Sequence, residues 1–328
     1  MRPNSSDAPE VVITGAGVVT CLGASRTATL DALRRGERVR GAPLPCLAGT
    51  PHAGCLGAQE PEWDVAAHVA AHVADRRMRK FMSRHAELAA IAARQALAEA
   101  DSQGRGIPAD RVGLYAGVGL AATDLRSSAD LLRNSLDSAG DFNLERFAHS
   151  GLPTIHPLWS FHTLPNMPAC IVSVLEGIQG DNAIYSPWED QTAFALLEAA
   201  HALERGDIDR AVVVASDTPA HPACLAELAL AGHIAPPEVA ASGAACLVLE
   251  RPDKEPSVRT LAHLRDLRLA ALSRPAPRPR DPLAPFIGRT VAAAPLLLIA
   301  LAPFFDLPRR LDGCGGHSFS FEAVAGDG

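Results

Sequence analysis

Three features of the sequence predict an α/β fold: short apolar runs rich in β-branched residues, amphipathic segments between them, and glycines that close those segments. The run 211–215 reads AVVVA, which is typical of a strand buried on both faces. Gly36 and Gly206 each follow a helical pattern and predict where it ends. With 328 residues, of which 48% are hydrophobic and 20% charged, the chain has ample apolar material for a core.

The predicted strands and helices alternate along the chain. The first element is a buried strand at 10–19 that ends in a turn at Gly15-Ala16-Gly17. Further strands are expected at 111–117, 182–186, 210–215 and 244–250, and helices at 24–35, 79–101, 123–136, 166–176 and 187–205. The segment 141–165 contains three prolines and is expected to be irregular.

The most apolar stretch, 291–305, is interrupted by Pro295 and Pro303. It is shorter than the roughly 20 residues that a helix needs to cross a bilayer. We therefore expect a buried core helix and no membrane insertion. The following segment 313–320 (GCGGHSFS) predicts a tight loop before a last strand.

Composition excludes several classes of function. The formal net charge of −7 argues against a nucleic-acid-binding surface. The seven cysteines form no CxxC pair or zinc-like cluster with histidines, so we expect no metal and no other cofactor. Their odd number, and an N-terminus unlike a signal peptide, predict a cytoplasmic location.

Four sequence segments carry a family resemblance. They are VVITGAGVVTCLGASRTATLDALRRGE (11–37), LPNMPACIVSVLEGIQGDN (164–182), ERGDIDRAVVVASDTP (204–219) and SGAACLVLE (242–250). Their order and spacing resemble the β-ketoacyl-acyl carrier protein synthases. The resemblance implies an α/β, thiolase-like fold, layered αβαβα with two mixed five-stranded sheets, in which the C-terminal half is reduced.

The resemblance also divides the chain into parts. Residues 1–9 are expected to form a flexible N-terminal tail, and 10–252 to form an N-terminal ketosynthase-like half. Residues 253–328 would be a truncated C-terminal half with a proline-rich connector at 274–285, which has five prolines.

The positions that hold the catalytic residues of this family are occupied by other residues here. The nucleophilic cysteine of condensing members corresponds to Glu189, the second histidine to Arg289 and the lysine to Ala284. The first histidine belongs to a segment that the connector at 274–285 replaces. His317, in the surviving glycine-rich loop, is interpreted as a loop residue and not a base. The resemblance therefore implies that no residue of this chain is catalytic.

Glu189 also has a structural interpretation, which we favour over a catalytic one. Ser186-Pro187-Trp188-Glu189 fits a capping box, with Ser186 at the N-cap and Glu189 at the third helical position. Asp190 beside it suits the positive end of the helix dipole.

The pattern of losses is similar to the chain-length factors of type II polyketide synthases, which pair with an active ketosynthase and shape its acyl tunnel. The shortened C-terminal half and the glutamate at 189 favour a relative that serves polyene or highly reduced chains. The expected partners are an active ketosynthase and, through the complex, an acyl carrier protein. Tunnel-lining candidates are Thr123, Ser127, Leu131, Trp159, Phe161, His162 and Met167; dimer-interface candidates are Asn182, Ala183, Ile184, Tyr185, Ser186 and Trp188.

Three alternatives remain open from the sequence. Glu189 could promote decarboxylation of malonyl carrier protein. The chain could stabilise a ketosynthase partner without affecting its product. It could also be a decayed copy without function, although intact strand patterns argue against decay.

Overall fold

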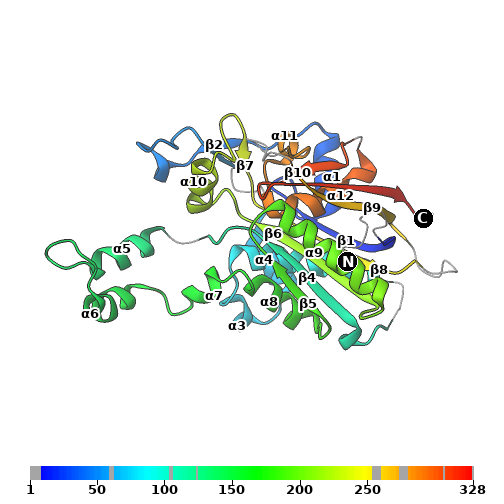
Figure 1. Ribbon diagram of the computed structural model, residues 1–328, viewed down its shortest axis with the longest axis horizontal. Coiled ribbons are helices and arrows are strands. Elements are labelled where there is room, and N and C mark those ends of the chain that lie inside the picture. The colour runs from blue at the N-terminus through cyan, green and yellow to red at the C-terminus, as the bar shows by residue number, and fades with distance from the viewer. Residues whose placement is uncertain are drawn as a thin grey trace.

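The computed structural model describes residues 9–58, 63–102, 106–122, 125–252, 260–272, 280–305 and 307–326. An eight-stranded mixed sheet runs through them in the order β10-β11-β9-β1-β8-β6-β4-β5 (Figure 1). The strands are β1 (Val11–Val19), β4 (Val112–Val118), β5 (Asn182–Tyr185), β6 (Arg210–Asp217), β8 (Gly243–Glu250), β9 (Ala262–Ala271), β10 (Arg310–Asp312) and β11 (His317–Ala325). The α/β fold class predicted from the sequence is confirmed.

The five strands β1, β8, β6, β4 and β5 form a mixed sheet covered on both faces. β4 runs parallel to β5 and β6, whereas β8 is antiparallel to β6 and β1. Alternate side chains of β6 point to opposite faces, so Val212 and Val214 pack with α4 (Arg84–Asp101) and α8 (Met167–Glu176). Val213 faces α9 (Glu189–Arg205) and α12 (Ala294–Leu301). Burial on both faces explains the uninterrupted apolar runs of the sequence.

The described residues of the C-terminal part add three strands to the sheet. β9 pairs with β1 at Val11–Ile13, β11 pairs with β9, and β10 pairs with β11 as the edge strand on that side. The apolar sides of β9 and β11 join the same core as α9 and α12, which places these helices between the two parts of the sheet. The expected two five-stranded sheets are therefore corrected: among the described residues, five strands and a reduced C-terminal set of three form one continuous sheet.

The apolar stretch 291–305 forms the predicted core helix. Every residue of α12 is buried, and short 3₁₀ turns precede and follow it. No helix among the described residues is long and apolar enough to cross a membrane.

The glycines of β1 correct one detail of the sequence analysis. The strand does not turn at Gly15-Ala16-Gly17 but continues to Val19. A Cβ at Gly17 would lie 1.9 Å from the carbonyl oxygen of Ala92, and one at Gly15 would lie 2.0 Å from that of Ala96. These glycines therefore let the backbone of α4 approach the strand closely.

Residues 125–166 form an arm that extends away from the body (Figure 1). The segment 141–165, predicted to be irregular, contains several short helices. The arm holds α5 (Leu125–Ser135), α6 (Leu144–Arg146) and α7 (Trp159–Thr163), with a π-helical turn at Phe147–Gly151. Six of the twelve large hydrophobic side chains that are exposed among the described residues lie on it: Leu132, Phe142, Leu144, Leu152, Phe161 and Leu164.

The remaining elements surround this framework. A small sheet contains β2 (Gly41–Pro43), β3 (Leu56–Ala58) and β7 (Val239–Ala240). The other helices are α1 (Arg26–Arg34), α2 (Val65–His72), α3 (Arg76–Arg79), α10 (Pro222–Leu230) and α11 (Ala284–Ile287). Residues 1–8 of the predicted tail and 274–279 of the predicted connector lie outside the described residues.

Substitution of Gly17 tests the close approach of β1 and α4. Because the added methyl group meets backbone atoms, Gly17→Ala is expected to lower the free energy of unfolding by about 1–3 kcal/mol. Gly106 is the matched control, since a Cβ there meets nothing within 4 Å. Urea unfolding of both variants provides the measurement. Equal stability of Gly17→Ala and Gly106→Ala would contradict the packing described.

Candidate functional site

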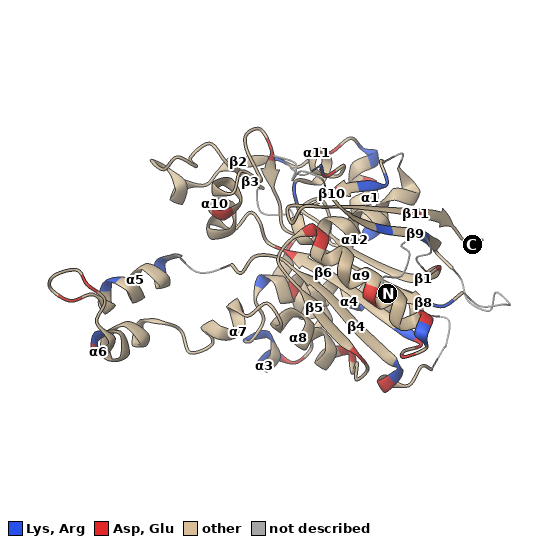
Figure 2. Cartoon of the chain, viewed as in Figure 1, with Lys and Arg blue, Asp and Glu red and all other residues tan. Residues whose placement is uncertain are grey.

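The start of α9 lies in the interior, and two acidic residues occupy it. Glu189 and Asp190 are the first two residues of the helix and are almost fully buried. Figure 2 shows acidic residues at this end of α9. The helix dipole favours negative charge there.

The predicted capping box at this helix is wrong. The N-cap is Trp188, whose side chain makes no capping hydrogen bond, and Ser186 precedes the helix. The physical reason is that the Glu189 carboxylate turns away from its own backbone. It binds a buried cation and a neighbouring loop, both more favourable partners than a single backbone N–H.

Glu189 and Arg289 form a buried ion pair. The Arg289 Nη2 atom donates to Oε1 of Glu189 at 2.7 Å, and both side chains are only 1% exposed. Burial alone would lower the pKa of Arg289, but the charges of Glu189 and Asp281 raise it above its ordinary value. The structure thus joins the two positions that the sequence analysis matched to the nucleophile and to the second histidine of condensing members.

Cys314 completes the environment of the ion pair, although it lies far from Glu189 in the sequence. Its backbone N–H donates to Oε2 of Glu189 at 3.0 Å. Its Sγ atom lies 3.6 Å from Oε1 of Glu189 and 3.8 Å from Nη2 of Arg289. Burial, followed by the negative charge of Glu189, raises the pKa of this thiol. We refer to Glu189, Arg289 and Cys314 as the central cluster.

The glycines of the loop 313–316 allow it to pack against the start of α9. A Cβ at Gly315 would lie 2.1 Å from Oδ2 of Asp190, and one at Gly313 would lie 3.0 Å from the backbone nitrogen of Asp190. After this loop, His317 begins β11 and donates from Nδ1 to Oδ2 of Asp190 at 2.8 Å. His317 therefore anchors the loop to the buried helix end.

Asp217 is a buried acid that sequence reasoning missed. Its oxygens accept the backbone N–H groups of Thr218 and Ala292 at 2.7 and 3.0 Å. Burial raises the pKa of Asp217 well above its usual value, and the charge of Glu189 adds to the shift. The sequence signal that could have identified Asp217 is its position at the carboxyl end of a buried strand.

A cavity of about 980 Å³ lies beside the central cluster. Ala284, matched to the lysine of condensing members, lines it together with Glu238 and Asp281. Glu238 lies 3.9 Å from Arg289, and burial raises the pKa of Asp281 to about 6. Across the described residues, no group of three or more histidine, cysteine or acidic side chains is arranged to hold a metal ion.

The tunnel candidates occupy the arm and its base. Ser127 and Leu131 lie on α5, Trp159, Phe161 and His162 on α7, and Met167 at the start of α8. Phe161 packs edge-on against Phe81 with ring centroids 5.2 Å apart, and His162 Nε2 donates to the carbonyl of Lys80 at 3.1 Å. Thr123 lies outside the described residues. The arm candidates are thus grouped apart from the central cluster.

The interface candidates divide into two groups. Asn182, Ala183, Ile184 and Tyr185 make up β5, which is the edge strand of the sheet. Ser186 follows it. Trp188 instead packs inside the molecule, where its ring meets His233 at a centroid distance of 5.3 Å.

Comparison with known proteins agrees with the fold. Residues 8–253 match the model of the β-ketoacyl synthase N-terminal domain. No curated protein matched the sequence significantly.

Solved structures share the fold at low sequence identity. The complex described as "AntDE:AntF (apo): type II PKS acyl-carrier protein in complex with its ketosynthase bound to the hexaketide" matches with TM-score 0.72 and 15% identity, over 97% of this chain and 99% of that one. A β-ketoacyl synthase from Burkholderia phymatum STM815 matches with TM-score 0.63 and 19% identity, over 80% of this chain and 64% of that one. The structure described as the ishigamide ketosynthase/chain length factor matches with TM-score 0.59 and 17% identity, over 84% of this chain and 70% of that one.

The family match covers most of the chain, from the first strand through β8. It includes α9 and the strands on either side of it. The chain therefore belongs to the β-ketoacyl synthase family.

Proposed function

We propose that this chain is a non-catalytic subunit that forms a heterodimer with an active ketosynthase and limits the length of its polyketide or polyene product. The observation that carries the proposal is the buried ion pair between Glu189 and Arg289. In the sequence match to condensing relatives, these two residues correspond to the nucleophilic cysteine and the second histidine.

The central cluster is poorly suited to acyl transfer. Both oxygens of the Glu189 carboxylate already accept hydrogen bonds, one from Arg289 and one from the backbone of Cys314. An acyl group on this carboxylate would be a labile mixed anhydride, not a thioester. The Cys314 thiol is kept protonated by burial and by Glu189, so it cannot replace the missing nucleophile as a thiolate.

The same contacts argue against a decarboxylase that uses Glu189. Decarboxylation of a malonyl group develops negative charge at the substrate, which needs nearby hydrogen-bond donors and no competing anion. Here the nearest cation, Arg289, is already neutralised by Glu189 at 2.7 Å.

The exposed edge of the outer strand β5 supports the binding of a partner chain. Among the described strands it pairs only with β4, and Figure 2 shows no charged residue on it. Unpaired edges are normally protected by charge, proline or a covering element. Ile184 on this strand is 36% exposed. Addition of a partner strand at β5 would satisfy its free backbone groups.

The arm provides the second part of the proposed interface. Its exposed apolar side chains are the kind of surface that monomers seldom carry as a patch. The buried indole N–H of Trp159 has no hydrogen-bond partner among the described residues, although such groups are nearly always paired. We infer that partner and acyl chain complete this region, with Leu131, Trp159 and Phe161 bordering the tunnel.

Reactivity of Cys314 tests the protonated state of the thiol in the central cluster. Because its pKa is raised, the thiolate fraction at pH 8 is small and alkylation is expected to be slow. The exposed Cys46 and Cys170 serve as internal controls and should react first. Timed N-ethylmaleimide labelling followed by peptide mass spectrometry measures the order. Labelling of Cys314 ahead of both controls would indicate an activated nucleophile and oppose the proposal.

A double-mutant cycle tests the ion pair. Glu189→Gln or Arg289→Met alone leaves a buried charge without its partner, which is expected to lower the unfolding free energy by about 3–5 kcal/mol. The double variant should lose much less than the sum of the two.

The surface pair of Asp31 and Arg34, whose side chains are 48% and 57% exposed, is the matched control. Asp31→Asn is expected to change stability by less than about 1 kcal/mol. Additive losses in the Glu189 and Arg289 cycle, measured by urea unfolding, would mean that the two charges do not stabilise each other.

Co-expression with an active ketosynthase from the same genome tests the proposed function. A stable heterodimer is expected by size-exclusion chromatography and native mass spectrometry. Ile184→Asp, on β5, should prevent it. Val324→Asp is the control, since Val324 is a 43% exposed strand residue on β11, away from β5.

Product analysis separates the proposal from its rivals. With carrier protein and malonyl donor, Phe161→Ala and Leu131→Ala in the heterodimer should lengthen the product without abolishing condensation. A heterodimer whose product length never changes would be a structural stabiliser only. Acetyl carrier protein formed by the isolated chain would instead identify a decarboxylase.

A further inference from the structure

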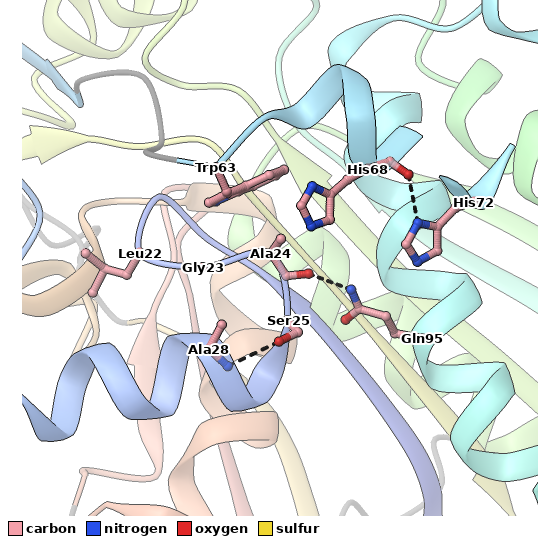
Figure 3. A pocket seen from close by; sticks show the side chains of 9 residues that line it. All are labelled: Leu22, Gly23, Ala24, Ser25, Ala28, Trp63, His68, His72 and Gln95. Atoms are coloured by element: carbon pink, nitrogen blue, oxygen red, sulfur yellow. Dashed lines mark hydrogen bonds between the residues drawn. The ribbon is translucent and has the colours of Figure 1, made fainter. Parts of the chain in front are cut away.

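One cavity shares no residue with the central cluster or the arm, and the proposed function leaves it unused. It has a volume of about 520 Å³ and lies between the start of α1 and one face of α2, with Gln95 of α4 on its wall. Figure 3 shows the imidazole rings of His68 and His72 in this cavity, on the side of Gln95. A cavity of this size suits a small ligand.

Each of the two rings keeps one nitrogen available for a ligand. Nδ1 of His68 lies 2.9 Å from the carbonyl oxygen of Asp64, and Nδ1 of His72 lies 2.8 Å from the carbonyl oxygen of His68. A carbonyl oxygen only accepts, so each Nδ1 carries a proton and each Nε2 of the neutral ring is an acceptor. Neither Nε2 atom has a hydrogen-bond partner among the described residues.

The helix sets the spacing of these two acceptors. Both rings bond the carbonyl four residues earlier, so they take matching orientations, one turn apart on the same side of α2. Because each residue of a helix rises by about 1.5 Å, the two Nε2 atoms are offset by roughly 6 Å along the helix axis. One ion cannot contact both atoms at this spacing, whereas two donors on one small molecule can.

The wall of the cavity carries no permanent charge. The described residues that line it include no acid, lysine or arginine. The Gln95 amide is engaged, since it donates to the carbonyl of Ala24 at 2.6 Å and accepts the N–H of Val18 at 3.3 Å. An anion or an ammonium ion placed here would lack a counter-charge, which is costly away from bulk water. The wall therefore favours an uncharged ligand.

Trp63 gives the cavity an aromatic wall. Its indole N–H donates to the carbonyl of Thr20 at 3.1 Å, and its ring packs edge-on against His68 with centroids 5.2 Å apart. Leu22 and Ala28 also line the cavity. Because the indole is held by these contacts, it presents a fixed apolar surface beside the two acceptors.

We propose that this cavity binds an uncharged polyol of about monosaccharide size, with one hydroxyl donating to Nε2 of His68 and another to Nε2 of His72. Hydroxyl groups on opposite sides of a six-membered ring span one helical turn. The C–H face of that ring packs against Trp63, which buries apolar surface while the hydroxyls stay hydrogen-bonded. A ring with a single hydroxyl engages only one of the two acceptors.

Binding is measured on the full chain alone at pH 8, where free imidazole is neutral. The probe is methyl β-D-glucopyranoside, followed by saturation-transfer NMR and by tryptophan fluorescence. Binding at about millimolar concentration is expected, since the contacts are few. Cyclohexanol is the matched ligand control, and it should bind at least about 3-fold more weakly because it makes one hydrogen bond fewer.

Two substitutions remove the acceptors and keep an aromatic ring in place. His68→Phe and His72→Phe are each expected to weaken binding by about 3- to 10-fold, as for the loss of one hydrogen bond. The double variant should show no saturation transfer. His156→Phe is the matched protein control, since this exposed arm residue lies outside the cavity, and it should bind as the unchanged chain does. Circular dichroism checks that each variant is folded.

Three results would overturn the proposal. The first is unchanged affinity in the folded His68→Phe/His72→Phe variant. The second is equal binding of cyclohexanol, because the two acceptors would then not select the ligand. The third is displacement of the glucoside by inorganic phosphate, which would identify an anion site instead. None of these measurements needs a ketosynthase partner, so their outcome is independent of the proposed function.

Discussion

The interior of this protein depends on one constraint: the charges of Glu189 and Arg289 must remain together. A single buried charge costs several kcal/mol, whereas a paired and hydrogen-bonded one is tolerated. The pair joins the start of α9 to the segment before α12, while the backbone of Arg289 bonds to Val239 and Ala241 of the small-sheet region. The loop that carries Cys314 closes over the same carboxylate. Helix, loop and small sheet thus meet at a buried polar contact beside the apolar core.

Polarity is distributed in an unusual way between the centre and the surface. The centre, at the start of α9, holds charges that satisfy each other. The arm and the β5 edge, by contrast, expose apolar side chains and unpaired backbone. Under the proposed function, this distribution favours covering the surface with another chain over binding a reactive substrate at the centre.

The sequence predicted the framework well because its signals are local. Apolar runs defined the buried strands, and Gly36 and Gly206 ended α1 and α9 as expected. It failed where the outcome depended on distant residues. Ser186 and Glu189 form a plausible capping box until Arg289, one hundred residues away, supplies a stronger partner. The glycines of β1 look like a turn because nothing local indicates that α4 packs against them. Cys314 enters the site only through the folding of the C-terminal loop.

Under the proposed function, the ion pair also limits a return to condensation chemistry. Glu189→Cys would leave the guanidinium of Arg289 buried without its carboxylate, and Arg289→His would leave Glu189 without its ion-pair partner. Either change alone removes one partner of a buried pair and is expected to destabilise the fold. A stepwise exchange of the two residues therefore passes through a less stable protein, so substitutions elsewhere accumulate more easily than substitutions at the pair.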